Sequence, residues 1–156
     1  MSEMMSKVCI GVDPGARGSM AIIHPDGGVD LFPWDDAHMY FEELEILDCR
    51  NFRPMAAIEH VNAMPGQGVT SMFNFGRNFG MVLGMFHTLR IPFELVRPQR
   101  WMKDFGISGD KNDHVAVARR LFPEVSLKRT PRCVKDDDGH ADALLLAEWA
   151  RRHFNG

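Results

Sequence analysis

The sequence predicts one α/β domain in which a single mixed sheet carries helices on its faces. The length of 156 residues fits one domain. The chain opens with three short apolar runs joined by glycine-containing links, a pattern typical of an antiparallel meander. Helical and strand-like segments then alternate, which favours helices packed against the same sheet. With 45% hydrophobic and 25% charged residues, the composition excludes a chain that is disordered throughout.

Five segments have the apolar, often β-branched character of buried strands. Turn residues at positions 13–18 and 25–28 separate the first three, and a glycine-rich loop at 62–70 follows the fourth. The expected strands span residues 7–12, 19–24, 29–34, 54–61 and 92–96.

Four segments show the apolar spacing of helices. The last has four small or apolar residues on one face, namely Ala143, Leu144, Ala147 and Ala150. Ser71 or Thr70 is expected to cap the second helix, and Asp110 or Gly109 to open the third. The expected helices span residues 36–49, 71–89, 110–121 and 139–154.

Several classes of protein are excluded by the composition. No apolar run approaches the roughly 18 residues that a membrane helix needs. The first seven residues have neither the apolar core of a signal peptide nor an Arg-rich stretch, which predicts a cytoplasmic protein with a flexible tail at residues 1–6. Three cysteines without metal-like spacing (Cys9, Cys49 and Cys133) indicate reduced thiols.

The charges are unevenly distributed along the chain. The net charge is −3, but residues 1–96 carry 12 acidic and 6 basic side chains, whereas residues 97–135 carry 4 acidic and 10 basic ones. Residues 136–156 are acidic again, with 5 acidic and 2 basic side chains. A basic segment between acidic ones suggests a polyanionic partner rather than a uniformly charged surface.

Four carboxylates fall where they can meet. Asp13 closes the first strand, and Glu59 closes the fourth, so the two meet at one sheet edge if these strands are neighbours. Asp138 and Asp142 lie four residues apart and share a helix face. Converging carboxylates suit hard cations such as Mg²⁺ or Mn²⁺. Two such ions can activate water and stabilise the leaving oxygen in phosphodiester hydrolysis.

Each acid also has an ordinary structural interpretation. Asp13 precedes Pro14 and Gly15 and is a plausible turn residue, and the acids at 136–138 form a solvated run that includes a helix cap. Glu59 and Asp142 are harder to explain in this way, because both interrupt apolar segments. The combination of all four carries the metal hypothesis.

These residues also carry a resemblance to a known family. Val12-Asp13-Pro14-Gly15, Ile58-Glu59 and the segment 138–143 (Asp-Gly-His-Ala-Asp-Ala) resemble the RuvC family of Holliday-junction resolvases. The likeness continues through residues 97–103 and 109–111 and covers about residues 8–150. It is nearest to the phage-type and chloroplast-type branch, which shares the Pro-Gly-Gln-Gly loop at residues 65–68.

The resemblance implies an RNase H-like fold, in which helices flank a five-stranded mixed sheet. It also implies a homodimer that cuts opposed strands of a four-way DNA junction with two Mg²⁺ or Mn²⁺ ions per site. Asp13, Glu59 and Asp142 would be metal ligands. The family places its fourth ligand three residues before the last Asp, at the position of Gly139. Asp138 is preferred here because it shares a helix face with Asp142, and His140 is the alternative. Lys103 and Lys111 match the two basic residues that the family has near the scissile phosphate.

Further residues are expected at the DNA. Asn62 stands where well-studied members have an aromatic residue that stacks on junction bases, and Met64 or Phe73 could substitute for it. The expected DNA-binding residues are Asn62, Met64, Gln67, Arg77, Arg97, Arg100, Lys128, Arg129, Arg132 and Lys135. Solvated surface charge is the alternative interpretation of the basic ones.

Three glycines recur at intervals of four in the second helix. Gly76, Gly80 and Gly84 lie on one helix face, and each glycine disfavours a helix interior by roughly 1 kcal/mol. Close approach of another backbone would explain them. That backbone belongs either to this chain's own sheet or to a second copy across a dimer interface, which the resemblance favours.

The preferred function is therefore a metal-dependent Holliday-junction resolvase without nucleotide cofactor or membrane partner. A debranching nuclease of the same fold with broader specificity for branched DNA, such as forks and flaps, is the nearest alternative. An actin-like ATPase or sugar kinase also begins with strand-Asp-x-Gly, but that fold needs two lobes and this chain holds one. A junction-binding protein that does not cleave would not need the acids.

Overall fold

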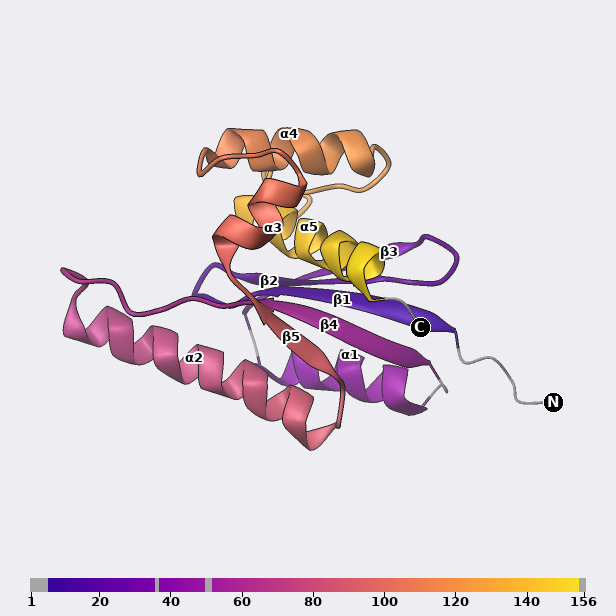
Figure 1. Cartoon of the computed structure of the whole chain (residues 1–156), viewed down its shortest axis with the longest axis horizontal. Helices are drawn as coiled ribbons and strands as arrows, with labels where there is room; N and C mark the ends of the chain where they lie inside the picture. The colour runs from indigo at the N-terminus through magenta and orange to yellow at the C-terminus, as the bar shows by residue number, and fades with distance from the viewer. Residues whose placement is uncertain (1–5, 36, 50–51, 155–156) are drawn as a thin grey trace.

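A five-stranded mixed sheet forms the middle of three layers (Figure 1). The computed structural model describes residues 6–35, 37–49 and 52–154. The strands are β1 (Lys7–Asp13), β2 (Ser19–Ile23), β3 (Val29–Pro33), β4 (Arg53–Glu59) and β5 (Phe93–Val96). They lie in the order β3-β2-β1-β4-β5, with the first three antiparallel and both β1–β4 and β4–β5 parallel. The predicted meander and mixed sheet are thus confirmed.

Helices cover both faces of the sheet (Figure 1). One face carries α1 (Ala37–Cys49) and α2 (Val69–Thr88). The other carries α5 (Asp138–His153) directly on the strands, with α3 (Pro98–Asp104) and α4 (Lys111–Leu121) packed beside and over it. None of the described helices has the length and hydropathy that crossing a membrane requires.

The structure differs from the sequence prediction in three local respects. The short helix α3 was not predicted; Pro98 occupies its first turn, where a missing N–H is harmless. Helix α2 begins at Val69 with Gly68 as N-cap and no side-chain cap, so the expected cap at Ser71 or Thr70 is wrong. The fourth strand ends at Glu59 and does not reach residue 61.

Some expectations fall on parts of the chain without description. Residues 1–5 of the expected tail and residue 36 of the first helix lie outside the described residues. The same holds for the side chain of Cys49. Cys9 and Cys133 are free thiols, as expected.

Strand register brings the first two acids together. In the parallel pair of β1 and β4, Val12 lies opposite Ile58. Asp13 and Glu59 are the next residues of their strands, and parallel neighbours end at the same edge of a sheet. The sequence-based expectation that these two acids meet is therefore confirmed by the strand pairing.

Small residues line the sheet face that receives α5. Large side chains such as Ile10 and Ile22 point to the face covered by α1 and α2, whereas Gly11, Ala21 and Ala57 lie on the α5 side. A Cβ added at Gly11 would overlap the backbone carbonyl oxygen of Ala143 and the backbone nitrogen of Ala147. The lack of a side chain at residue 11 lets the helix backbone rest on the central strand.

We predict that Gly11→Ala lowers the free energy of unfolding by about 3 kcal/mol, because the added methyl group meets helix backbone that has no room to shift. Urea denaturation followed by circular dichroism measures the change. Gly109→Ala is the matched control, since a Cβ there meets open space and should alter stability by less than about 0.5 kcal/mol. Equal stability of the two variants would contradict the close packing of α5 on β1.

Candidate active site

Three of the predicted acids line one cavity at the ends of β1 and β4. Asp13, Glu59 and Asp138 share an opening of about 290 Å³. The turn between β1 and β2 forms one wall, and Phe75 of α2 contributes another part of the lining. Asp138 reaches the cavity from the first turn of α5, which Asp137 caps by accepting a hydrogen bond from the His140 backbone at 2.9 Å.

Asp142 lies one turn further along α5 and is only 1% exposed. Both of its oxygens are engaged by α4. Lys111 forms an ion pair with Oδ2, and His114 Nδ1 lies 2.6 Å from Oδ1. The other His114 ring nitrogen, Nε2, lies 2.6 Å from the Ser108 carbonyl oxygen. Two helices thus hold this carboxylate in place.

Glu59 is held by α3. The indole nitrogen Nε1 of Trp101 donates a hydrogen bond to Glu59 Oε2 at 3.0 Å. Trp101 is fully buried and meets His114 edge to face, with ring centroids 5.4 Å apart. Trp101, which binds Glu59, and His114, which binds Asp142, are therefore in contact with each other.

Two of the acids, Asp13 and Glu59, have raised pKa values. Burial and the neighbouring charges of Glu59 and Asp142 hold the pKa of Asp13 well above its ordinary value. Burial and Asp142 likewise raise the pKa of Glu59, although Trp101 works in the opposite direction. Burial lowers the pKa of Lys111, but Asp142, Asp13 and Glu59 outweigh that effect and raise it. The cluster is thus rich in negative charge that Lys111 only partly offsets.

The two candidates for the fourth acidic position face different spaces. Asp138 lines the cavity of Asp13 and Glu59. His140 is buried, places Nδ1 2.6 Å from the Ser19 hydroxyl oxygen, and lines a separate cavity on the β2–β3 side. Burial lowers the pKa of His140. Of the two, only Asp138 shares a space with the other acids.

The donor set suits a hard divalent cation. The neighbouring charges that help to raise the pKa values of Asp13 and Glu59 are charges that a cation would neutralise, and an all-oxygen set favours Mg²⁺ or Mn²⁺. Within the described residues, no three His, Cys, Asp or Glu side chains are arranged so that they could hold a metal ion as they stand. Asp142 is paired with Lys111 and His114.

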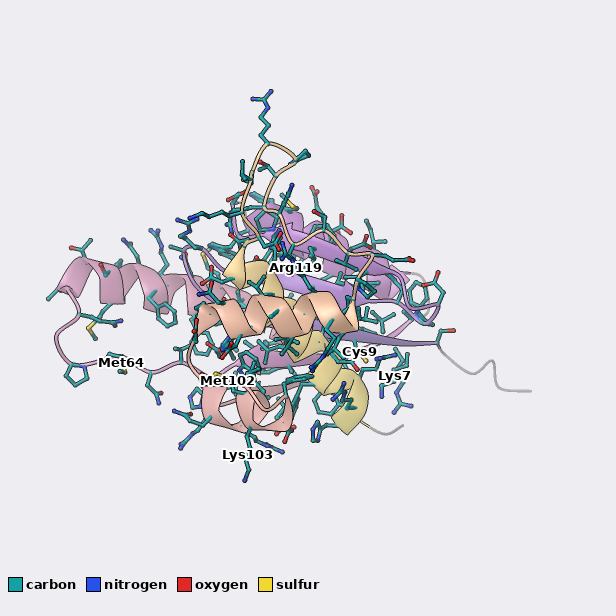
Figure 2. The ribbon with its side chains drawn as sticks, turned by 90° about the horizontal axis from the view of Figure 1, so that it is seen from above. Lys7, Cys9, Met64, Met102, Lys103 and Arg119 are labelled. Carbon is teal, nitrogen blue, oxygen red and sulfur yellow. The ribbon has the colours of Figure 1, made fainter. Side chains whose placement is uncertain are left out.

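The two predicted lysines are placed differently. Lys111 is at the acids, at the start of α4. Lys103 lies in the last turn of α3 and points away from the body of the protein in Figure 2. Among the residues that the structure describes, it makes no contact with the four carboxylates.

The predicted DNA-binding residues surround the site in several groups. Asn62, Met64 and Arg97 line a cavity of about 240 Å³ just beyond Glu59. Lys128 and Arg129 line a larger cavity of about 500 Å³ on the β2–β3 side. Exposed positions in the loop before α2, in α2 itself and in the loop before α5 hold the others, namely Gln67, Arg77, Arg132 and Lys135.

Two of the predicted DNA-binding arginines have internal partners. Arg100 pairs with Glu94 at 2.5 Å and lies over the Trp149 ring, 5.0 Å from its centroid. Arg129 lies 3.4 Å from both Asp35 and Asp137, and thereby ties the loop before α5 to the rest of the fold. Both arginines therefore have interaction partners within the chain.

The glycine face of α2 is open. A Cβ added at Gly76, Gly80 or Gly84 would meet no atom within 4 Å. Packing of this stripe against the chain's own sheet, one of the two interpretations of the spacing, is therefore wrong. Phe73 is 69% exposed on the same helix, and Met81 is 41% exposed.

Sequence reasoning missed four residues at the site. Trp101 and His114 support the acids, and Arg17 and Phe75 line the cavity. Trp101 is 42 residues from Glu59, and His114 is 28 residues from Asp142, so no local pattern connects either one to its acid. Trp101 lies within residues 97–103, which carry part of the family resemblance, but nothing in that segment connects it to Glu59.

Comparison with curated proteins finds a relative with a similar sequence. The sequence is 34% identical to the Holliday junction resolvase MOC1, chloroplastic, of Chlamydomonas reinhardtii over an alignment of 108 residues. The alignment covers 63% of this chain. The match covers 11% of that protein, so this chain corresponds to about a tenth of its length. No protein-family model matches the chain.

Solved structures show the same fold. Thermus thermophilus RuvC in complex with a Holliday junction substrate aligns with a TM-score of 0.59 and 19% identity over 94% of this chain and 95% of that chain. A second Thermus thermophilus RuvC structure gives 0.55 and 18% over 93% and 95%. The predicted RNase H-like fold and the resemblance to RuvC are confirmed.

We predict opposite stability effects for two acids of the cluster. The folded state raises the pKa of Asp13 above its ordinary value of 3.8. The free energy of unfolding therefore falls as the pH rises from 3.8 to the raised pKa of the folded state. Asp13→Asn should therefore stabilise the metal-free protein at pH 7 by about 1 kcal/mol and lose this advantage below pH 3.8.

Asp142→Asn is the comparison variant, because the Asp142 carboxylate is paired with Lys111 and His114. It should destabilise the protein by about 2 kcal/mol, since Lys111 is free to turn to solvent but His114 is not. Thermal unfolding in a chelator at several pH values measures both variants. A loss of stability in Asp13→Asn at pH 7 would contradict the repulsion argument.

Proposed function

We propose that this chain, which has the fold of RuvC and sequence similarity to a chloroplast Holliday junction resolvase, is a metal-dependent, structure-selective endodeoxyribonuclease. Its substrate would be the four-way DNA junction, resolved by paired symmetric nicks. The observation that carries the proposal is the convergence of Asp13, Glu59, Asp138 and Asp142, with Lys111, at one edge of this fold. The names of the similar proteins support the same activity.

The four carboxylates would hold two Mg²⁺ or Mn²⁺ ions. When bound, such ions activate water and stabilise the leaving oxygen in phosphodiester hydrolysis. Lys111 places its ammonium group at the acids and would stabilise charge that develops on the phosphate. The exposed Lys103 is the second basic candidate, and its outward position suits a contact with a phosphate further along the backbone.

The DNA would cross the site between two basic regions. Arg97, Asn62 and Met64 border the cavity next to Glu59, where an unstacked base or a backbone turn could be held. The loop before α5 contributes Arg132 and Lys135 as exposed cations for phosphate contacts. Figure 2 places Met64 on the loop that leads into α2, at one end of the molecule.

Paired nicks need two active sites, which a homodimer would supply. The open glycine stripe of α2 permits close approach of a second backbone, and Phe73 and Met81 add exposed apolar surface on that helix. We propose that α2 packs against its counterpart in the dimer.

The first test is cleavage of a synthetic four-way junction in Mg²⁺, with product mapping and with fork, flap and duplex controls. The wild type should make symmetric nicks in the junction. Asp13→Asn should reduce cleavage more than about 100-fold but keep junction binding, because it removes a proposed ligand without adding bulk. Glu42→Gln, an exposed change on α1, is the control and should cleave normally.

The outcomes separate the candidate functions. Full activity of Asp13→Asn would refute its assignment as a ligand. Equal cleavage of forks, flaps and junctions would favour the broader debranching nuclease with the same site. Binding of the junction without cleavage by the wild type would favour a junction-binding protein.

We predict that Gly80→Leu shifts the dimer to monomer, because the side chain would fill the space that a second backbone needs. Light scattering across a concentration series measures the mass. Gly109→Leu, outside the helix, should leave the mass unchanged. An unaltered dimer in Gly80→Leu would contradict α2 as the interface.

A further inference from the structure

Two buried residues outside the acid cluster each contact one carboxylate oxygen within it. Trp101 of α3 and His114 of α4 are both 1% exposed. Trp101 donates to Glu59 Oε2, and His114 lies against Asp142 Oδ1. In each case the second oxygen, Glu59 Oε1 or Asp142 Oδ2, is left out of that contact.

The hydrogen-bond chemistry of His114 explains how it holds its partner. A backbone carbonyl only accepts, so the ring must donate from Nε2 to the Ser108 oxygen at 2.6 Å. This bond fixes the ring orientation and places Nδ1 2.6 Å from Asp142 Oδ1, to which Nδ1 donates when it carries a proton as well, that is, when the ring is an imidazolium. The edge of Trp101 packs against the same ring. His114 is thus anchored on two sides, and Asp142 Oδ1 is held against an immobile partner.

Lys111 contacts the other oxygen of Asp142 in a different way. Its side chain is 54% exposed, against 2% for His114, and ends a flexible chain at the start of α4. A lysine ammonium is a mobile point charge, which can leave when another cation arrives. The two partners of Asp142 therefore divide into a fixed one on Oδ1 and an exchangeable one on Oδ2.

Trp101 acts on Glu59 in the same manner as His114 acts on Asp142. An indole N–H is a donor only, so its bond favours the ionised carboxylate and restrains one oxygen. Because the two rings touch, helices α3 and α4 form a continuous support behind both acids. Outer partners of this kind orient metal ligands, and their loss typically weakens metal affinity or activity about 10–100-fold.

We propose that Trp101 and His114 are positioning residues that hold Glu59 Oε2 and Asp142 Oδ1, so that the opposite oxygens are presented to a divalent cation, and that Lys111 is the partner this cation displaces. The inference deepens the proposed function and rests on it. It predicts that loss of Trp101 or His114 weakens metal binding, whereas loss of Lys111 does not.

The test is Mn²⁺ binding to the full chain without DNA, measured by electron paramagnetic resonance and calorimetry. Trp101→Phe keeps an aromatic ring but removes the N–H that donates to Glu59, and it should weaken Mn²⁺ binding about 10-fold. His114→Leu should weaken it by a similar or larger factor, and His114→Asn by less, because its amide can still donate to Asp142. Lys111→Met should bind Mn²⁺ at least as tightly as the wild type, because a competing cation is gone.

Trp149→Phe is the matched control for Trp101→Phe. Trp149 is fully buried and donates from Nε1 to Asp104 Oδ2 at 2.7 Å, away from the acid cluster. The control loses an equivalent indole–carboxylate bond and should show a comparable loss of thermal stability, with Mn²⁺ affinity unchanged. A drop in affinity confined to Trp101→Phe is therefore a positional effect and not a general loss of stability.

Three results would overturn the inference. Wild-type Mn²⁺ affinity in folded Trp101→Phe and His114→Asn would show that these residues do not position the acids. Tighter binding in His114→Leu would show that His114, like Lys111, competes with the cation. Equal weakening by Trp149→Phe would assign the effect to stability. Failure of the proposed function is a different result, namely a wild type that neither binds Mn²⁺ nor cleaves the junction.

Discussion

Helix α5 can rest on the centre of the sheet only because the facing residues are small. Gly11 on β1 has no side chain, and the helix turns its backbone at Ala143 and Ala147 into that space. Residues 139–150 of α5 are consequently all buried. Asp142 is carried into the interior by this packing and ends beside Asp13 and Glu59, which the parallel pairing of β1 and β4 has already brought to one edge. The acid cluster depends on that close contact.

Placing several carboxylates close together opposes folding, and helices α3 and α4 supply the groups that offset their charge. Lys111 and His114 of α4 engage Asp142, and Trp101 of α3 engages Glu59. Among the described residues, Asp13 has no hydrogen-bonded partner of this kind. Burial, Glu59 and Asp142 hold its pKa well above the ordinary value, although the charge of Lys111 acts in the opposite direction. The site thus keeps an excess of negative charge, as a site for divalent cations requires before they bind.

The two faces of the sheet serve different purposes. The face of α5, α3 and α4 builds the acid cluster, whereas α2 on the other face exposes a glycine stripe and apolar side chains. Phe75 of α2 also lines the acid cavity, so the helix that we propose as the dimer contact is connected to the site itself. In a dimer built on α2, the distance between the two active sites would be set by this helix.

The sequence alone predicts the strands and the long helices, because apolar periodicity is a local signal. It also points to four acids: Glu59 and Asp142 interrupt apolar segments, Asp13 closes a strand, and Asp138 lies four residues before Asp142. Two questions stayed open: whether Asp138 or His140 is the fourth ligand, and whether the α2 glycines face this chain's own sheet or a second copy. Only the tertiary structure decided which space each of these residues faces.

The same holds for the residues that sequence reasoning missed or placed otherwise. Trp101 and His114 reach their acids across 42 and 28 residues, and Arg100 turns to Glu94 and Trp149. Lys103 and Lys111 look alike in sequence, yet only Lys111 meets the carboxylates. The physical reason is that side-chain partnership depends on how helices α3, α4 and α5 pack in space, which the periodicity of each segment does not encode.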